Sequence, residues 1–155
     1  MTETRLGFLG MGLMGLPMAE RLCAAGFPLT VWNRSPQKAD PVVAMGAARA
    51  ATPAELARRS DVVMACLTNA AAVEAVLFGP GGVAEVSGPT IYVDFSSLDP
   101  HLTRTYAARL AEANGMGWVD APVSGGTPAA KAGTLTIMAG GAEADVARVA
   151  PLMDA

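Results

Sequence analysis

A glycine-rich stretch near the N-terminus limits the possible folds more than any other feature of this chain. It reads LGFLGMGLMGLPMAERL over residues 6–22 and contains Gly10-x-Gly12-x-x-Gly15. This spacing is typical of a strand-to-helix turn that binds a dinucleotide. The first glycine permits the sharp turn, the second lets the backbone approach the pyrophosphate, and the third lets the helix pack close to the sheet. We therefore predict cofactor contacts from the whole loop: Gly10, Met11, Gly12, Leu13, Met14 and Gly15.

The residues around the motif support this interpretation over a merely glycine-rich core turn. Residues 5–9 have the composition of a buried strand, and the apolar residues Met14, Met18, Leu22 and Ala25 recur at helical spacing up to Gly26. A diphosphate would then lie against the free N–H groups of a helix N-terminus, where the helix dipole favours negative charge.

The residues after the second predicted strand, 28–32, indicate which dinucleotide is bound. An Asp or Glu about 20 residues beyond the glycines would bind the ribose 2′-OH. Here Asn33 replaces that carboxylate, and Arg34 supplies a cation that can form charge-assisted bonds with a 2′-phosphate, with Ser35 in the same turn and Lys38 close by. NADP is therefore favoured over NAD as the cofactor. The alternative is a solvated Asn-Arg turn.

Apolar runs alternate with helical patterns along the rest of the chain, which predicts an α/β fold with a doubly wound, mainly parallel sheet. Predicted strands cover residues 47–50, 61–67, 90–95, 118–122 and 133–141, and predicted helices cover 40–46, 53–59, 70–78, 100–114 and the segment from 142 onward. The helix starts carry N-cap residues: Asp40 before Pro41, Thr52 with Glu55 in capping-box spacing, and Asn69.

Polar residues follow several of these strands at the edge where open α/β sheets bind their ligands. Leu67 and Thr68 follow one strand, and Ser96 and Ser97 follow the next. The two serines could face a nicotinamide, or could equally serve to start the following helix. Further on, Ser124-Gly125-Gly126 offers a hydroxyl and two glycine N–H groups together, which suits a carboxylate.

Composition narrows the partners and the compartment. The 155 residues carry a net charge of -3, so nucleic acid is not an expected partner. Hydrophobic residues make up 52% and charged residues 16%, which suggests a missing neighbouring domain. Cys23 and Cys66 lie in apolar patterns and are expected to be small buried thiols in a reducing compartment, the cytoplasm. The apolar run 6–19 is too short and too glycine-rich to span a membrane.

Four segments, in order, resemble the β-hydroxyacid dehydrogenases, a family that includes 3-hydroxyisobutyrate dehydrogenase and tartronate semialdehyde reductase. They are GFLGMGLMGLPMAERL, VWNRSPQK, DFSSLDP and DAPVSGG followed by AGTLTIMAGG, and the resemblance extends over essentially all 155 residues. The resemblance implies a Rossmann core with a strand-bearing extension, followed in full-length members by an all-helical second domain. It also implies reversible hydride transfer between NADP(H) and a short β-hydroxy acid or semialdehyde.

The resemblance also implies roles for individual residues. The dinucleotide loop falls on residues 7–21, and the adenosine-side contacts fall on Asn33, Arg34, Leu67 and Thr68. The nicotinamide-side pair falls on Ser96 and Ser97, and the site for the substrate carboxylate falls on Ser124, Gly125 and Gly126.

The family's catalytic lysine lies on the first long helix of its second domain, so no catalytic residue is expected in this chain. Lys131 and the single histidine, His101, are expected to be ordinary surface residues. We therefore expect residues 1–155 to be a dinucleotide-binding domain truncated at its C-terminal end, which binds NADP(H) weakly and turns over nothing. The full-length parent is expected to form a homo-oligomer through the helical domain. The alternatives are an imine reductase-like enzyme and a non-catalytic, dehydrogenase-like binding module.

Overall fold

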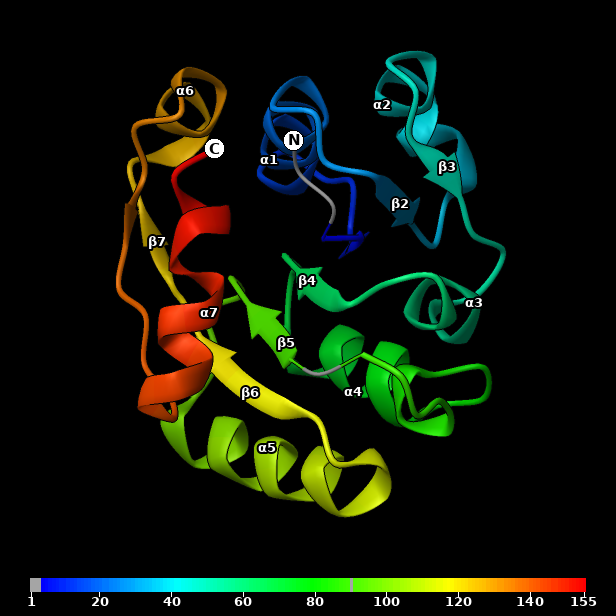
Figure 1. Ribbon diagram of the computed structural model, residues 1–155, viewed down its shortest axis with the longest axis vertical. Coiled ribbons are helices and arrows are strands. Elements are labelled where there is room, and N and C mark those ends of the chain that lie inside the picture. The colour runs from blue at the N-terminus through cyan, green and yellow to red at the C-terminus, as the bar shows by residue number, and fades with distance from the viewer. Residues whose placement is uncertain (1–3, 90) are drawn as a thin grey trace.

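Six parallel strands form the centre of the molecule, in the order β3-β2-β1-β4-β5-β6 (Figure 1). The computed structural model describes residues 4–89 and 91–155. The strands are β1 Leu6–Leu9, β2 Leu29–Trp32, β3 Ala48–Arg49, β4 Val62–Ala65, β5 Ile91–Asp94 and β6 Gly117–Asp120. The strand order reverses at β1, because β2 and β3 extend to one side of it and β4 to β6 to the other. This is the Rossmann arrangement, so the predicted fold class is confirmed.

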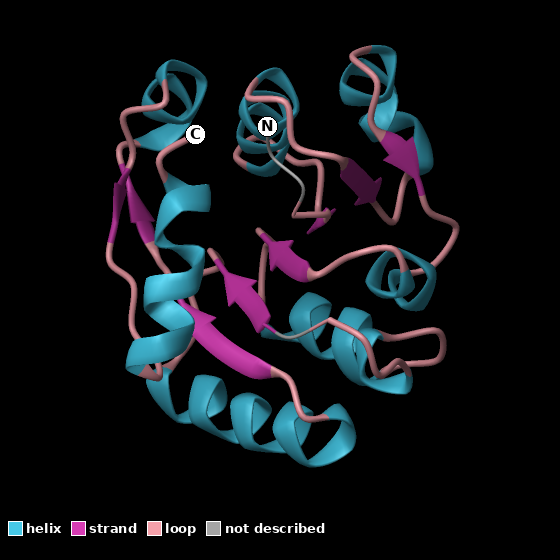
Figure 2. Cartoon of the chain, in the orientation of Figure 1, coloured by secondary structure: helices cyan, strands magenta, loops and turns pink. Residues whose placement is uncertain are grey.

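Helices cover both faces of the sheet (Figure 2). One face carries α1 Gly15–Ala24, α2 Asp40–Ala44, α6 Gly126–Ala132 and α7 Glu143–Met153, and the other carries α3 Pro53–Arg58, α4 Ala70–Phe78 and α5 Pro100–Asn114. Two short 3-10 helices, η1 Pro36–Ala39 and η2 Val83–Glu85, lie in the connections. Within the described residues, no helix combines the length and the apolar character needed to cross a bilayer.

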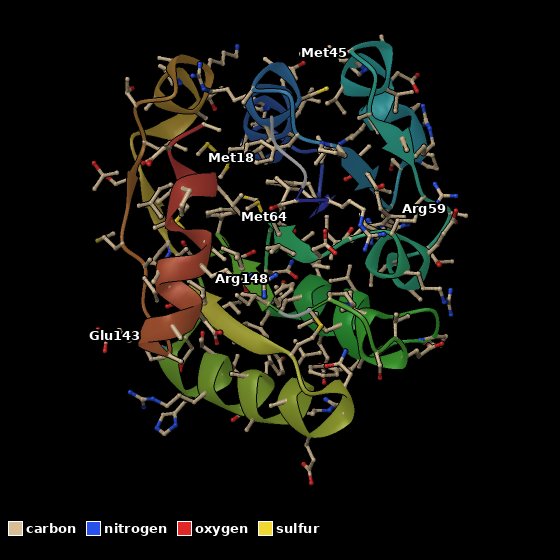
Figure 3. The ribbon with its side chains drawn as sticks, viewed as in Figure 1. Met18, Met45, Arg59, Met64, Glu143 and Arg148 are labelled. Carbon is tan, nitrogen blue, oxygen red and sulfur yellow. The ribbon has the colours of Figure 1, made fainter. Side chains whose placement is uncertain are left out.

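The central strands are buried on both faces, which is why they are apolar at nearly every position. Alternate residues point to opposite layers, so Phe8 and Met64 pack under α1, whereas Val63 and Tyr92 pack toward α3, α4 and α5. Figure 3 labels Met18 on α1 and Met64 on β4, both of which belong to the α1-side core. Burying apolar side chains of this size stabilises the fold by about 1.5–3 kcal/mol each.

The segment predicted as one strand over residues 133–141 is divided in the structure. Gly133 ends α6 in the left-handed conformation, with φ +71°. Only Thr136–Ile137 forms a strand, β8, which pairs antiparallel with β7, Val123–Ser124. Gly140 then bridges to Asp120 at the end of β6 through two backbone hydrogen bonds of 2.7 and 2.8 Å. The segment therefore forms a small two-stranded sheet beside the main one.

Two of the three predicted N-caps are confirmed. Thr52 Oγ1 accepts a hydrogen bond from the N–H of Glu55 at 3.1 Å, and Asn69 Oδ1 accepts one from Ala72 at 2.9 Å. The capping box is modified, because Glu55 reaches back to the N–H of Ala51 and not to that of Thr52.

The prediction that Asp40 is a helix N-cap was wrong. The 3-10 helix η1 runs directly into α2, so Asp40 is already helical, and its carboxylate pairs with Arg49. The apolar helical pattern of α1 ends one residue early, since Ala25 is an exposed C-cap. The predicted first residue of the fifth strand, Thr90, lies outside the described residues.

Cys23 and Cys66 are half-buried, whereas the sequence predicted that they are fully buried, and neither forms a disulfide. Cys66 follows β4 next to the glycine-rich loop, and burial raises the pKa of its thiol to about 11. The nearby carboxylate of Asp94 adds to this shift.

We predict that Thr52→Ala lowers the free energy of unfolding by about 1 kcal/mol, because the N–H of Glu55 loses its side-chain acceptor. The matched control is Thr105→Ala, which removes a hydroxyl from the exposed middle of α5, where the Thr105 hydroxyl donates to the carbonyl of His101. Urea unfolding should show no loss for the control, since alanine is the better helix former. Equal destabilisation of both variants would contradict the assigned cap.

Candidate functional site

The glycine-rich loop joins β1 to α1, and its first and third glycines have the turn and packing roles that the motif predicts. Gly10 has φ +99°, and a side chain there would overlap the carbonyl oxygen of Cys66 on the adjacent strand end. A Cβ at Gly15 would overlap the carbonyl oxygen of Gly10, so the helix can pack this close only with glycine. A Cβ at Gly12 would meet nothing within 4 Å, so its backbone faces open space.

The loop presents unpaired N–H groups to that space. The N–H groups of Gly12, Leu13, Met14 and Gly15 donate to no acceptor in the described part of the chain. Met14 is the N-cap residue of α1 and provides no side-chain cap, and the first turn of the helix carries no acidic residue. The arrangement fits the diphosphate of a dinucleotide, because free N–H groups and the helix dipole both favour an anion there.

Asn33 connects this loop to the turn after β2. Its Oδ1 accepts a hydrogen bond from the N–H of Met11 at 2.9 Å, and its Nδ2 donates to the carbonyl of Ser35 at 2.9 Å. The sequence pointed to Asn33 as a contact on the adenosine side. In the structure, both ends of its amide hold the protein's own backbone, so Asn33 fixes the loop relative to the turn that carries Arg34.

A cavity of about 520 Å³ lies at the carboxyl ends of β2 and β3. Arg34 lies in its wall, is exposed, and forms no ion pair with any described residue. Lys38 and Ser35 do not line this cavity, although the sequence grouped them with Arg34. The lining residues are Trp32, Asn33, Arg34, Pro36, Arg49, Ala50, Ala51 and Glu55. Arg49 was missed, since only the pairing of β2 with β3 brings it to this position.

The ends of β4 and β5 are tied together by Ser96. Its Oγ accepts a hydrogen bond from the N–H of Leu67 at 2.8 Å, and its own N–H donates to Asp94 Oδ1 at 2.8 Å. Ser96 is buried, whereas Ser97 and Thr68 are exposed. Of the predicted serine pair, Ser97 is therefore the one whose side chain is open to a ligand, and Ser96 shapes the strand ends beneath it.

Asp94 is a fully buried carboxylate below these residues. Its Oδ2 has no hydrogen-bond partner among the described residues. Burial raises the pKa of Asp94 to about 6, the negative charge of Asp120 adds to the rise, and hydrogen bonds from Ser96 oppose it. Asp120 is the in-register neighbour of Asp94 on β6, and burial also raises its pKa. Two adjacent carboxyl groups thus share the end of β5 and β6.

The predicted substrate turn lies next to the dinucleotide loop. Ser124 is the exposed last residue of β7, and Gly125 and Gly126 have φ of +132° and +67° at the start of α6. The N–H groups of both glycines donate to no described acceptor. Thr127 Oγ1 lies 3.9 Å from Met14 Sδ, a contact between two motifs separated by more than a hundred residues in the sequence. Two groups of free backbone donors therefore share one edge of the molecule.

Residues 5–155 match the protein family described as the NAD binding domain of 6-phosphogluconate dehydrogenase. Among curated proteins, the chain is 42% identical over 152 residues to 2-hydroxy-3-oxopropionate reductase of Escherichia coli, covering 97% of this chain and 51% of the relative. It is 41% identical over 150 residues to 2-(hydroxymethyl)glutarate dehydrogenase of Eubacterium barkeri, covering 96% and 50%. The chain thus spans about half the length of these curated relatives.

Other relatives and solved structures are similar over nearly all of this chain. The human cytokine-like nuclear factor N-PAC is 37% identical over 141 residues, covering 90% of this chain and 25% of that protein. A 3-hydroxyisobutyrate dehydrogenase structure from Mycobacterium tuberculosis with L-serine superimposes with a TM-score of 0.90 at 31% identity, covering 99% and 52%. A reductive aminase from Aspergillus terreus in complex with NADPH gives 0.84 at 31% identity, covering 99% and 53%.

Two glycine substitutions should differ in their effect on stability, because Gly15 packs against backbone and Gly12 faces open space. Gly15→Ala should lower the free energy of unfolding by about 1–3 kcal/mol, because the new methyl group collides with the Gly10 carbonyl. Gly12→Ala should change it by less than about 0.5 kcal/mol, since no atom lies near the new methyl group. Urea unfolding followed by circular dichroism measures both. Similar stability losses would show that the loop geometry is wrong.

Asp94 should make stability depend on pH. Its pKa is about 6 in the folded chain and near 3.8 when unfolded, so the folded state binds the proton more tightly. Stability should therefore fall as pH rises from about 4 to 6, by about 3 kcal/mol from this group. In Asp94→Asn, unfolding free energies measured between pH 4 and 7 should lose most of this decline, whatever the absolute stability of the variant. The exposed Asp154→Asn should keep the decline, and an unchanged slope in Asp94→Asn would refute the assignment.

Proposed function

The chain belongs to the family of NAD binding domains of 6-phosphogluconate dehydrogenase, in the form found in β-hydroxyacid dehydrogenases. On that premise, we propose that it binds NADP(H) for hydride transfer to or from a short β-hydroxy acid or its semialdehyde. One observation carries the proposal: the turn of Ser124, Gly125 and Gly126 lies beside the dinucleotide loop, in contact through Thr127 and Met14. A bound nicotinamide supplies the hydride chemistry, and the residues of this chain supply binding and orientation.

The cofactor is proposed to lie along the carboxyl edge of the sheet. The free N–H groups of residues 12–15 would hold the pyrophosphate, and Arg34 in the cavity beyond β2 would pair with the 2′-phosphate. Leu67 and Thr68, after β4, would contact the adenosine side of the cofactor, and the Ser97 hydroxyl would face the nicotinamide half. NADP is preferred over NAD because Asn33 stands at the position where the motif would have a carboxylate to accept from the ribose 2′-OH.

The substrate is proposed to be a small carboxylic acid. The Ser124 hydroxyl and the N–H groups of Gly125 and Gly126 are donors with no acceptor among the described residues, which suits a carboxylate. The two bacterial relatives are named for compounds that carry carboxylates, 2-hydroxy-3-oxopropionate and 2-(hydroxymethyl)glutarate. Holding the carboxylate here would set the reacting carbon beside the nicotinamide, so Ser124 orients the substrate and does not itself transfer the proton.

The proton donor is proposed to be a lysine outside residues 1–155, as the family resemblance implies. Lys131 lies exposed on α6, and its backbone carbonyl accepts a hydrogen bond from Arg21. We propose that the 155-residue chain binds the cofactor without turnover, and that an adjoining helical domain supplies the lysine and the homo-oligomer interface. That the relatives are about twice as long as this chain supports this proposal.

Two other functions have specific support. The reductive aminase from Aspergillus terreus is as similar in sequence, at 31%, as the 3-hydroxyisobutyrate dehydrogenase structure, which favours imine reduction as a second candidate. N-PAC, a nuclear factor by name, is 37% identical over 141 residues, which favours a dehydrogenase-like binding module as a third. The hydroxy acid function is preferred because the Ser124 turn offers donors for a carboxylate, which an imine does not require.

The test is the activity of a protein that joins this chain to a second domain of its relatives' type, assayed with NADPH. We expect reduction of one or more of glyoxylate and succinic, tartronate and methylmalonate semialdehydes, and no turnover by the 155-residue chain alone. Ser124→Ala should raise KM for the acid about tenfold or more with a smaller change in kcat, because a charge-assisted hydrogen bond is lost. The exposed Thr134→Ala serves as a control.

Reduction of cyclic imines in place of every semialdehyde would favour the second candidate over the first. Cofactor binding without any turnover by the two-domain protein would favour the third. Robust activity of the 155-residue chain alone would refute the proposed external lysine.

A further inference from the structure

The cavity beyond β2 contains a second cation that the dinucleotide motif does not include. Arg49 is the last residue of β3, and the parallel pairing sets it in register with Val31 on β2, two residues before Asn33. Arg34 and Arg49 both line the cavity of about 520 Å³, one from the turn after β2 and one from the neighbouring strand. Two arginines thus line the same space from two separate elements.

The guanidinium of Arg49 is held in one orientation by the segment that follows Arg34. Its Nη1 donates to the carbonyl of Pro36, and its Nη2 pairs with Asp40 Oδ1 at 2.5 Å. An arginine side chain carries five N–H donors, so these two bonds leave donors available for a ligand. Because the group is already oriented, a bound anion would pay less of the ordering cost that a free arginine imposes.

The other charged groups near the cavity do not cancel this pair. Among the described residues that line the cavity, only Glu55 has a carboxylate, and its two oxygens are engaged by the N–H of Ala51 at 2.7 Å and by Arg59 at 2.8 Å. Asp40 offsets part of the charge of Arg49, whereas Arg34 has no carboxylate partner among the described residues. The cavity wall therefore has a net positive charge, and Arg34 contributes most of it.

We propose that Arg49 is a second cation for the 2′-phosphate of the adenosine ribose and, together with Arg34, determines the preference for the phosphorylated cofactor. This inference rests on the proposed function, because it needs the adenosine end of a dinucleotide in this cavity. A 2′-phosphate carries about two negative charges near neutral pH, and two arginines from separate elements can bind it in complementary directions.

The experiment measures dissociation constants of NADPH and NADH for the 155-residue chain by isothermal titration calorimetry. Arg49→Met should weaken NADPH binding about tenfold or more and leave NADH binding within about twofold. Arg49→Lys should lose part of the NADPH affinity, since it keeps the charge but not the fixed fork. The control, Arg58→Met, removes an exposed cation of α3 that does not line the cavity and should change neither constant.

Arg34→Met distinguishes this inference from the proposed function. If Arg34→Met loses the preference for NADPH while Arg49→Met keeps it, the role of Arg49 is refuted and the proposed cofactor stands. If Arg49→Met weakens both cofactors equally, Arg49 supports the cavity and does not select the phosphate, which also refutes the inference. If the unsubstituted chain prefers NADH or binds neither cofactor, the proposed function and this inference fail together.

Discussion

The structure depends on the close approach of backbone at Gly10 and Gly15. The N–H of Gly10 donates to the carbonyl of Trp32 at 2.9 Å, and the other side of Gly10 lies against the carbonyl of Cys66, so this residue is packed between the ends of β2 and β4. Gly15 then brings α1 against the Gly10 carbonyl. Because no side chain fits at either contact, the start of α1 is held at the one point where the strand order reverses. The free N–H groups of the loop are directed outward as a result.

The charges of the site are arranged along the edge of the sheet. Arginines lie beyond β2 and β3, where the cavity opens, and backbone donors lie at the centre. The buried carboxyl group of Asp94 and the half-buried one of Asp120 lie beyond these, at the ends of β5 and β6. The proposed cofactor, NADP, carries phosphates at its adenosine end and in the middle, and its nicotinamide at the other end. The charges along this edge therefore follow the order that the proposed cofactor would require.

Local sequence patterns predicted the fold well, because strands, glycines and caps are determined by neighbouring residues. The helix Pro100–Asn114 and the caps at Thr52 and Asn69 were predicted correctly. The features that local patterns did not predict depend on pairing between distant parts of the chain. Arg49 joins the cavity only through the register of β3 on β2, and Asp40 faces Arg49 because a 3-10 helix precedes α2.

Side-chain roles at the site were less predictable for the same reason. Ser96 resembled a ligand contact in sequence, but the approach of β4 makes it an acceptor for the N–H of Leu67. The contact of Thr127 with Met14 also depends on the return of the chain from β6 to α1, which no local pattern records. The sequence therefore predicted which residues lie at these strand ends, but not which of them, such as Ser96, are engaged by the protein's own backbone.

The amide of Asn33 holds the glycine-rich loop and the turn that carries Arg34 at the same time. An aspartate at this position would still accept the hydrogen bond from Met11, but it could not donate to the carbonyl of Ser35. A substitution that installs a carboxylate here, as an acceptor for a ribose 2′-OH, would thus also release the turn that carries Arg34. Redesign of cofactor use in this scaffold would have to supply a new donor for Ser35 at the same time, so single-residue exchanges at position 33 start from a structural disadvantage.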